Sequence, residues 1–378
     1  MSRQGSRHGS GHGRGRLAGS LAGSLAGVLG VAAAGTAIGV LRQQRQISRR
    51  AGDDVSFGSL RSPAVTVVAS DGVNLHVEVD EVDPGTPGTA DRLLRRVGRR
   101  DPDVTVVFVH GFCLNLDCWH FQRAAYRGLV RSVYYDQRSH GRSDDSTREH
   151  SNIDQLGRDL KEVIDSVAPD GPVVLVGHSM GGMTIIAFAE QFPELIGERV
   201  VGAALISTTA GGLDPGRILL PMLPARLTGP LTSRVVRTLR LRHGVVDAAR
   251  RSARAAATVA TDRLAFGEDV PASYVEFVDK MLGATPFETV ADFFPHFASL
   301  DKFDFVERLA AVPVSIICGT ADRLTSVGHS RKLHSRLPGS QLLECEGAGH
   351  MVIMERHDLV NSELDQLITA ATARAAER

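Results

Sequence analysis

Short apolar runs alternate with longer amphipathic stretches along most of this chain. Mainly apolar runs of this kind predict buried strands, because the strands of a parallel sheet are covered on both faces. We expect strands at Val104–Val109, Ser132–Asp136, Val173–Val176, Gly202–Ile206, Val314–Cys318 and Gln341–Cys345. Helical patterns separate these runs, and strands that alternate with helices predict an α/β fold with a mainly parallel sheet.

Two further runs precede this series and have a different pattern. Ala64–Ala69 and Asn74–Val82 alternate apolar and polar residues, and Ser70-Asp71-Gly72 joins them. An Asp-Gly pair between two alternating runs is a strong signal for a hairpin. The sheet is therefore expected to begin with an antiparallel pair.

One gap between predicted strands is much longer than its neighbours. About a hundred residues separate Ile206 from Val314, whereas a crossover between parallel strands needs only about a dozen. We therefore predict a helical cap at 208–305, flanked by core segments at 63–207 and 306–378. Its basic part, 215–254, could face lipid headgroups, acidic substrates or only solvent, and its phenylalanines could line a pocket or form the core of the cap.

The N-terminal region does not fit the sheet pattern. Residues 1–16 are rich in Gly, Ser, His and Arg, which predicts a disordered basic tail. Residues 17–41 contain no charge, and at ~1.5 Å per residue such a helix crosses a ~30 Å hydrocarbon layer. We interpret 17–41 as a membrane anchor or signal-anchor, with a cleaved signal peptide and a soluble helix as alternatives. A linker at 42–62 follows, and the predicted location is membrane-attached or exported, with cytoplasmic as the alternative.

A serine flanked by glycines follows one of the buried runs. Val173–Val176 leads into the sequence Gly177-His178-Ser179-Met180-Gly181-Gly182, and helix-compatible residues follow. A strand, a sharp turn and a helix in this order expose a serine hydroxyl at the tip of the turn, and the glycines let the backbones pass close to it. Ser179 is therefore predicted to be a nucleophile.

Two residues that could assist Ser179 also follow predicted strands. Asp322 comes after the run that ends at Cys318, and His350 comes after the run that ends at Cys345. Ligands collect at the carboxyl ends of parallel strands. We predict that His350 is the general base and that Asp322 orients its imidazole ring.

The loop after Val104–Val109 supplies candidates for stabilising negative charge. Acyl transfer needs two backbone N–H groups aimed at the developing oxyanion. We predict that the N–H groups of Phe112 and Met180 form this oxyanion hole. His110, Cys113 and Trp119 are candidate residues of the substrate pocket, and packing beneath the site is the alternative for His110 and Trp119.

Taken together, these motifs make the chain resemble the α/β-hydrolase superfamily, in its group of serine esterases, lipases and haloperoxidase-like enzymes. The resemblance covers roughly residues 63 to 375 and rests on His110-Gly111-Phe112, Asp136 to Ser143, Gly177 to Gly182, and the pair Asp322 and His350. It implies a mainly parallel eight-stranded sheet with helices on both faces, a cap inserted before the strand preceding Asp322, and hydrolysis of esters. Many relatives have glycine where this chain has Ser139.

Within this resemblance, a serine at the elbow excludes epoxide hydrolases and haloalkane dehalogenases, which use aspartate there. A carboxylic ester hydrolase acting on a small-molecule or lipid ester is the preferred function. An acyltransferase, a perhydrolase or a carbon–carbon hydrolase on the same triad remain alternatives, as does a membrane-anchored scaffold without activity. No metal or organic cofactor is implied.

Composition adds little to this interpretation. The 43 basic and 43 acidic residues balance, which gives no case for nucleic acid as a partner. None of the four cysteines forms a C-x-x-C pair, so neither zinc nor redox chemistry is indicated. We expect buried free thiols, with a bridge between Cys318 and Cys345 as the alternative. The oligomeric state is left open.

Overall fold

The computed structural model describes residues 40–50, 55–83, 104–213 and 254–377. The chain divides into two compact units, Met1–Arg49 and Arg50–Arg378. In the first unit the described residues form a helix over 40–47. The sheet, the cap and the candidate site all belong to the second unit.

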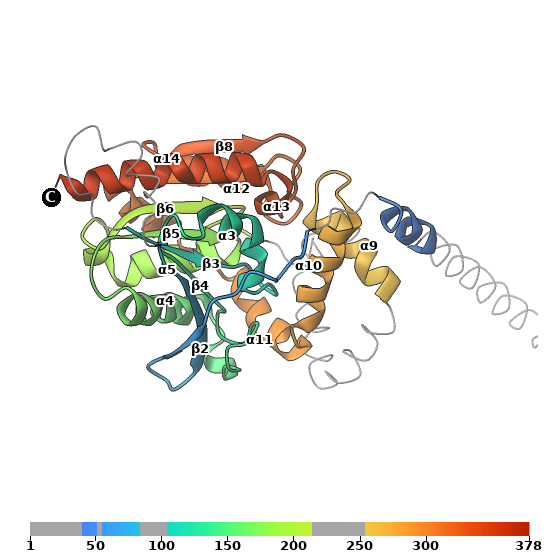
Figure 1. Ribbon diagram of the computed structural model, residues 1–378, viewed down its shortest axis with the longest axis horizontal. Helices are drawn as coiled ribbons and strands as arrows, with labels where there is room; N and C mark the ends of the chain where they lie inside the picture. The colour runs from blue at the N-terminus through green and yellow to red at the C-terminus, as the bar shows by residue number, and fades with distance from the viewer. Residues whose placement is uncertain (1–39, 51–54, 84–103, 214–253, 378) are drawn as a thin grey trace, which may run out of the picture. The chain divides into compact units, whose positions relative to one another are not determined.

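The second unit is built on one eight-stranded sheet with the order β1-β2-β4-β3-β5-β6-β7-β8 (Figure 1). The strands are β1 (Ala64–Val68), β2 (Asn74–Asp80), β3 (Thr105–Val109), β4 (Ser132–Tyr135), β5 (Val173–His178), β6 (Val200–Ile206), β7 (Val314–Gly319) and β8 (Gln341–Cys345). β2 pairs antiparallel with β1 and with β4, and every other pairing is parallel. The predicted hairpin and the mainly parallel sheet are both confirmed.

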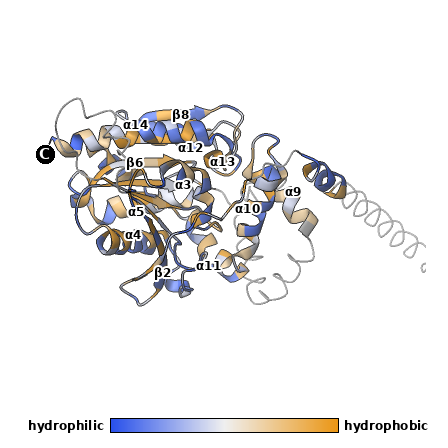
Figure 2. Ribbon diagram, viewed as in Figure 1, coloured by the Kyte–Doolittle hydropathy of each residue, from blue (hydrophilic) through white to orange (hydrophobic). Residues whose placement is uncertain are grey.

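Helices cover both faces of the sheet (Figure 1). α4 (Ile153–Val167) and α5 (Met180–Gln191) pack against each other on one face, and α3 (His120–Tyr126) and α14 (His357–Ala376) lie on the other. α12 (Val327–Arg336) connects β7 to β8 and packs against both strands, and the short α13 (Val352–Glu355) follows β8. Figure 2 shows apolar strands in the interior and helices of mixed polarity around them, as the sequence pattern predicts.

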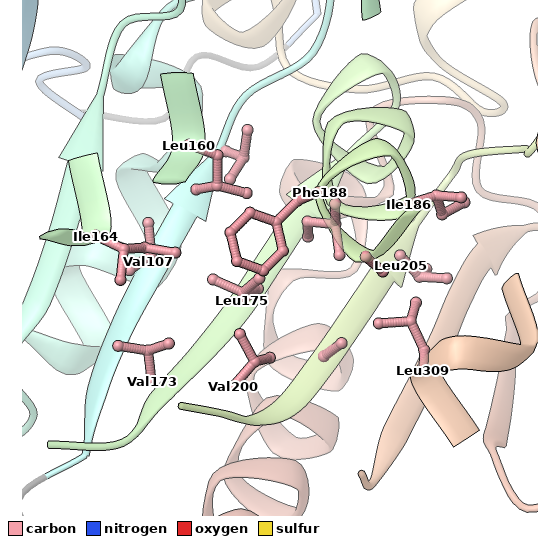
Figure 3. Packing of buried hydrophobic residues seen from close by; sticks show 14 of the residues in the cluster. Val107, Leu160, Ile164, Val173, Leu175, Ile186, Phe188, Val200, Leu205 and Leu309 are labelled. Atoms are coloured by element: carbon pink, nitrogen blue, oxygen red, sulfur yellow. The ribbon is translucent and has the colours of Figure 1, made fainter. Parts of the chain in front are cut away.

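Apolar side chains from the central strands fix the sheet to α4 and α5. Val107, Leu175 and Leu205 lie on the same face of neighbouring strands and pack with Leu160 and Phe188 (Figure 3). All five are buried, and burying each such side chain contributes roughly 1.5–3 kcal/mol. The carboxyl ends of β3, β5 and β7, where the predicted functional residues follow, are therefore held by a close-packed core.

The predicted cap occupies the connection between β6 and β7. It contains α9 (Arg254–Ala265), α10 (Ala272–Ala284) and α11 (Phe287–Ala298), and the 3₁₀ segment Phe303–Ala311 leads back to the sheet. This confirms the insertion of a helical cap before the strand that precedes Asp322. Residues 214–253, which include almost all of the basic part of the cap, lie outside the described residues.

Part of the predicted linker makes specific contacts with both the cap and the core. Arg50 forms an ion pair with Asp262 of α9. Phe57 stacks on Phe277 of α10, with ring centroids 4.5 Å apart, and meets Phe121 of α3 edge-on at 5.7 Å. Arg50 therefore contacts the cap, and Phe57 contacts both the cap and the core.

The predicted hydrophobic segment 17–41 lies almost entirely outside the described residues, as does the basic tail 1–16. No helix within the described ranges combines the length and the apolar character needed to cross a bilayer. Membrane attachment through 17–41 stays a prediction.

The predicted alternative of a bridge between Cys318 and Cys345 does not match the structure, in which both residues are buried thiols. The parallel register pairs Cys318 with Glu344 and Gly319 with Cys345. Because successive side chains of a strand point to opposite faces, the two thiols lie on opposite sides of the sheet.

Candidate functional site

Ser179 lies at a strained turn between β5 and α5. Its φ of 54° and ψ of −116° are unusual for a residue with a side chain. A Cβ added at Gly177 would lie 2.5 Å from the carbonyl oxygen of Gly181, and one added at Gly181 would lie 2.0 Å from that of Val109. Glycine at both positions therefore lets strand and helix approach closely enough to expose the serine hydroxyl.

The three predicted reacting residues meet at one edge of the sheet. The Ser179 hydroxyl lies 2.9 Å from Nε2 of His350, and Nδ1 of the same imidazole lies 2.9 Å from Oδ2 of Asp322. They follow β5, β8 and β7, which belong to one run of adjacent parallel strands. Residues separated by up to 171 positions in the sequence are thus within hydrogen-bonding distance.

The surroundings of Asp322 determine which nitrogen of His350 carries the proton. Burial raises the pKa of the Asp322 carboxyl, but the adjacent His350 and the N–H groups of Leu324 and Thr325 outweigh it, so the pKa lies below its usual value. These two N–H groups donate to Oδ1 at 2.8 and 2.9 Å. An ionised Asp322 can only accept, so Nδ1 of His350 is the donor and Nε2 is left to accept the proton of Ser179.

The two predicted oxyanion donors lie beside Ser179. Phe112 follows β3 and Met180 is the first residue of α5, and both line the same cavity as Ser179. The N–H groups in the first turn of a helix have no partner within the helix. This end of α5 therefore offers a backbone donor and a positive dipole to negative charge at the site.

An apolar cavity of about 370 Å³ opens onto Ser179 and His350. Phe112 and Met183 come from the core, and much of the remaining wall comes from the cap through Leu264, Val278 and Phe294. Among the described residues no charged side chain lines it. The phenylalanines of the cap have both predicted roles, since Phe294 lines the cavity and Phe293 is fully buried in a cluster with α5.

Of the three predicted pocket residues, only Cys113 lines this cavity. Trp119 is fully buried behind it and packs on Phe108, with ring centroids 5.2 Å apart. His110 is also fully buried, and burial lowers its pKa to about 3. Its neutral ring accepts the N–H of Gln137 at 2.9 Å and supports the loop from beneath. For both residues the structure shows the packing alternative, because proximity in sequence does not show which way a side chain points.

The turn after β4 supports the oxyanion loop. Asp136 is buried, which raises its pKa to about 6, and its carboxylate accepts the N–H groups of Leu116 at 2.7 Å and Arg142 at 2.8 Å. Ser139 has a φ of 62°. A left-handed conformation favours glycine, so a serine at this turn is held under backbone strain.

Two further side chains, His178 and Glu355, make contacts with the loop that carries His350. The fully buried His178 has its pKa lowered to about 3 by burial, and its Nε2–H donates to the carbonyl oxygen of His350 at 2.9 Å. The carboxylate of Glu355 accepts the N–H of Gly349 at 2.7 Å. The role of Glu355 was not predicted, and its position shortly after His350 is the only sequence signal for it. The described residues include no group of three or more His, Cys, Asp or Glu side chains arranged to hold a metal ion.

Comparison with protein families gives a match that covers most of the sheet and the cap. The family model described as "Alpha/beta hydrolase family" matches residues 106–363. An uncharacterized protein of Mycobacterium tuberculosis is 28% identical over 255 residues, which are 65% of this chain and 69% of that protein. A probable esterase of Oryza sativa subsp. indica is 32% identical over 99 residues, which are 26% of this chain and 38% of the esterase.

Solved structures show the same fold at low sequence identity. A thermophilic esterase from Thermogutta terrifontis superposes with a TM-score of 0.62 and 21% identity, covering 82% of this chain and 100% of the esterase. The enol-lactonase from Burkholderia xenovorans LB400 gives a TM-score of 0.59 and 21% identity, covering 81% of this chain and 100% of the lactonase.

Proposed function

The chain belongs to the alpha/beta hydrolase family, and on that premise we propose that it is a serine hydrolase that cleaves carboxylic esters. The observation that carries the proposal is the hydrogen-bonded series Ser179–His350–Asp322 at the mouth of an apolar cavity. Hydrolases named as esterases among the similar proteins support the same reaction class.

In the proposed reaction, Ser179 Oγ attacks the ester carbonyl carbon while its proton passes to Nε2 of His350. The negative charge on the carbonyl oxygen is stabilised by the N–H groups of Phe112 and Met180. Asp322 stabilises the positive charge that His350 acquires. The imidazolium then returns its proton to the leaving alcohol, and a water molecule repeats the sequence on the acyl-enzyme, which releases the acid.

The cavity favours an uncharged acyl group of small or medium size. A volume of about 370 Å³ lies at the lower end of the range for small-molecule sites, roughly 300–1,000 Å³. The described lining offers no cation to neutralise a carboxylate at the acyl end, and burying an unpaired charge is costly.

The proposal is tested by assaying the full-length protein on p-nitrophenyl esters of increasing acyl length, with and without an alcohol acceptor. We expect hydrolysis of the uncharged esters and labelling of the wild type by a fluorophosphonate probe. Ser179→Ala should lose both, while the control Ser326→Ala, at an exposed position, should keep both. Equal labelling of Ser179→Ala and wild type would overturn the proposal, and faster acyl transfer than hydrolysis would favour an acyltransferase.

A further inference from the structure

The loop that carries His350 lies directly against the backbone of the cap. A Cβ added at Gly267, which follows α9, would lie 2.1 Å from the carbonyl oxygen of Gly347. One added at Gly349 would lie 2.4 Å from the backbone nitrogen of Gly267. Real side chains do not tolerate such distances, so glycine at both positions lets the two backbones touch.

One carboxylate connects these two backbones. Glu355 lies in α13 and is half-buried. Its Oε1 accepts the N–H of Gly349 at 2.7 Å, and its Oε2 accepts the N–H of Gly267 at 3.0 Å. Each oxygen thus serves one side of the contact, and charge-assisted hydrogen bonds of this kind are roughly twice as strong as neutral ones.

The backbone on either side of His350 is held as well. The N–H of Met351 donates to the carbonyl of Ala265 in α9 at 2.8 Å. The carbonyl of His350 itself accepts from His178, the residue before the nucleophile, at 2.9 Å. Three consecutive residues, 349 to 351, are therefore fixed from outside their own loop, two of them through contacts that lead to the cap.

The pKa of the Glu355 carboxyl lies above its usual value, although several neighbouring groups lower it. Burial raises the pKa of its carboxyl, whereas hydrogen bonds from the N–H groups of Gly267, Gly349 and Glu268 and the charge of Arg356 act in the opposite direction. Arg356 also pairs with the side chain of Glu268 at 2.7 Å. The Glu355 carboxylate thus contacts the loop through the N–H of Gly349 and the cap through the N–H of Gly267.

We propose that Glu355 is a positioning residue that sets His350 through the backbone of Gly349 and couples this histidine to the cap. The proposal rests on the proposed function, in which His350 is the general base. The accepting atom of a base must lie within roughly 2.6–3.2 Å of the atom that carries the proton. A displacement of about 1 Å at a distance from the chemistry can cost about a hundredfold in rate. Cap movement that opens the Gly267 contact then also lowers the activity of the base.

Glu355→Gln tests this directly, because glutamine keeps the shape but has one accepting oxygen for two N–H groups. We expect kcat for a p-nitrophenyl ester to fall at least tenfold with KM within about twofold, and reaction with a fluorophosphonate to slow by a similar factor. Glu363→Gln is the matched control, since Glu363 is also half-buried but accepts from Ser315 on β7, away from the loop. It should leave both rates unchanged.

The outcomes separate this proposal from the proposed function. If the wild type hydrolyses no ester, or Ser179→Ala equals it, the proposed function fails before Glu355 is compared. If the wild type is active and Glu355→Gln has an unchanged kcat, or changes only KM, the positioning role is wrong. Should Glu355→Gln not fold, Glu355→Asp and Gly267→Ala provide the same comparison, the first by shortening the reach and the second by separating the backbones.

Discussion

The core and the cap contribute differently to the candidate site. Ser179, His350 and Asp322 all come from loops at the carboxyl ends of core strands, whereas Leu264, Val278 and Phe294 of the cavity wall come from three cap helices. The three side chains from the core are connected by hydrogen bonds. The cap residues form part of the cavity wall with their apolar side chains.

This difference shows what each region has to provide. Proton transfer depends on angles and on distances that are held to within a few tenths of an ångström, a precision that a packed sheet with paired backbones can maintain. A cavity wall has to provide volume and exclude water, which many arrangements of apolar side chains satisfy. Changes in the core should therefore affect the rate of reaction, and changes in the cap should affect which ester is used.

The largest effect is expected in the core. Asp322→Asn removes the negative charge that orients and stabilises His350, so kcat should fall about 10³–10⁴-fold in the same ester assay. Circular dichroism should show that the variant is folded. Asp304→Asn is the control, since the Asp304 side chain is 90% exposed, and it should retain the wild-type rate. A near-normal rate for Asp322→Asn would mean that another group orients the histidine.

A smaller and selective effect is expected in the cap. Phe294→Ala enlarges the cavity on its cap side, so the ratio of kcat/KM for long over short acyl esters should rise about tenfold. The rate with the shortest ester should change little. Leu359→Ala, at a side chain 50% exposed on α14, is the control. An equal loss of activity on all esters would contradict the division between the two regions.

The smallest effect is expected where Phe57 joins cap and core. Phe57→Ala removes its contacts with Phe277 and Phe121, and should lower the free energy of unfolding by about 2 kcal/mol, less than the ~3–5 kcal/mol of a fully buried phenylalanine. Urea denaturation measures this loss, and limited proteolysis should cut the cap sooner.

Phe305→Ala serves as its comparison, because Phe305 is also half-buried but lies in the segment that returns to the core. It should lower stability without exposing the cap to protease. If both variants behave alike, the segment around Phe57 does not secure the cap in particular.

The sequence alone determined the fold and the candidates for the reacting groups. Apolar runs marked the central strands, and Gly177 and Gly181 marked the turn at Ser179, because local sterics leave few other residues that fit there. Parallel strands end at the same edge of a sheet, so the positions of Asp322 and His350 after their strands were enough to bring them together.

Only the tertiary structure decided which side chains face the cavity and what holds the histidine loop. Sequence reasoning left His110 and Trp119 either at the pocket or packed beneath the site, and the structure shows both buried behind the pocket. It did not identify Glu355 as a partner of the loop. The physical reason is that strands and turns follow from local patterns, while the direction of a side chain and contacts between distant backbones depend on how separate elements pack.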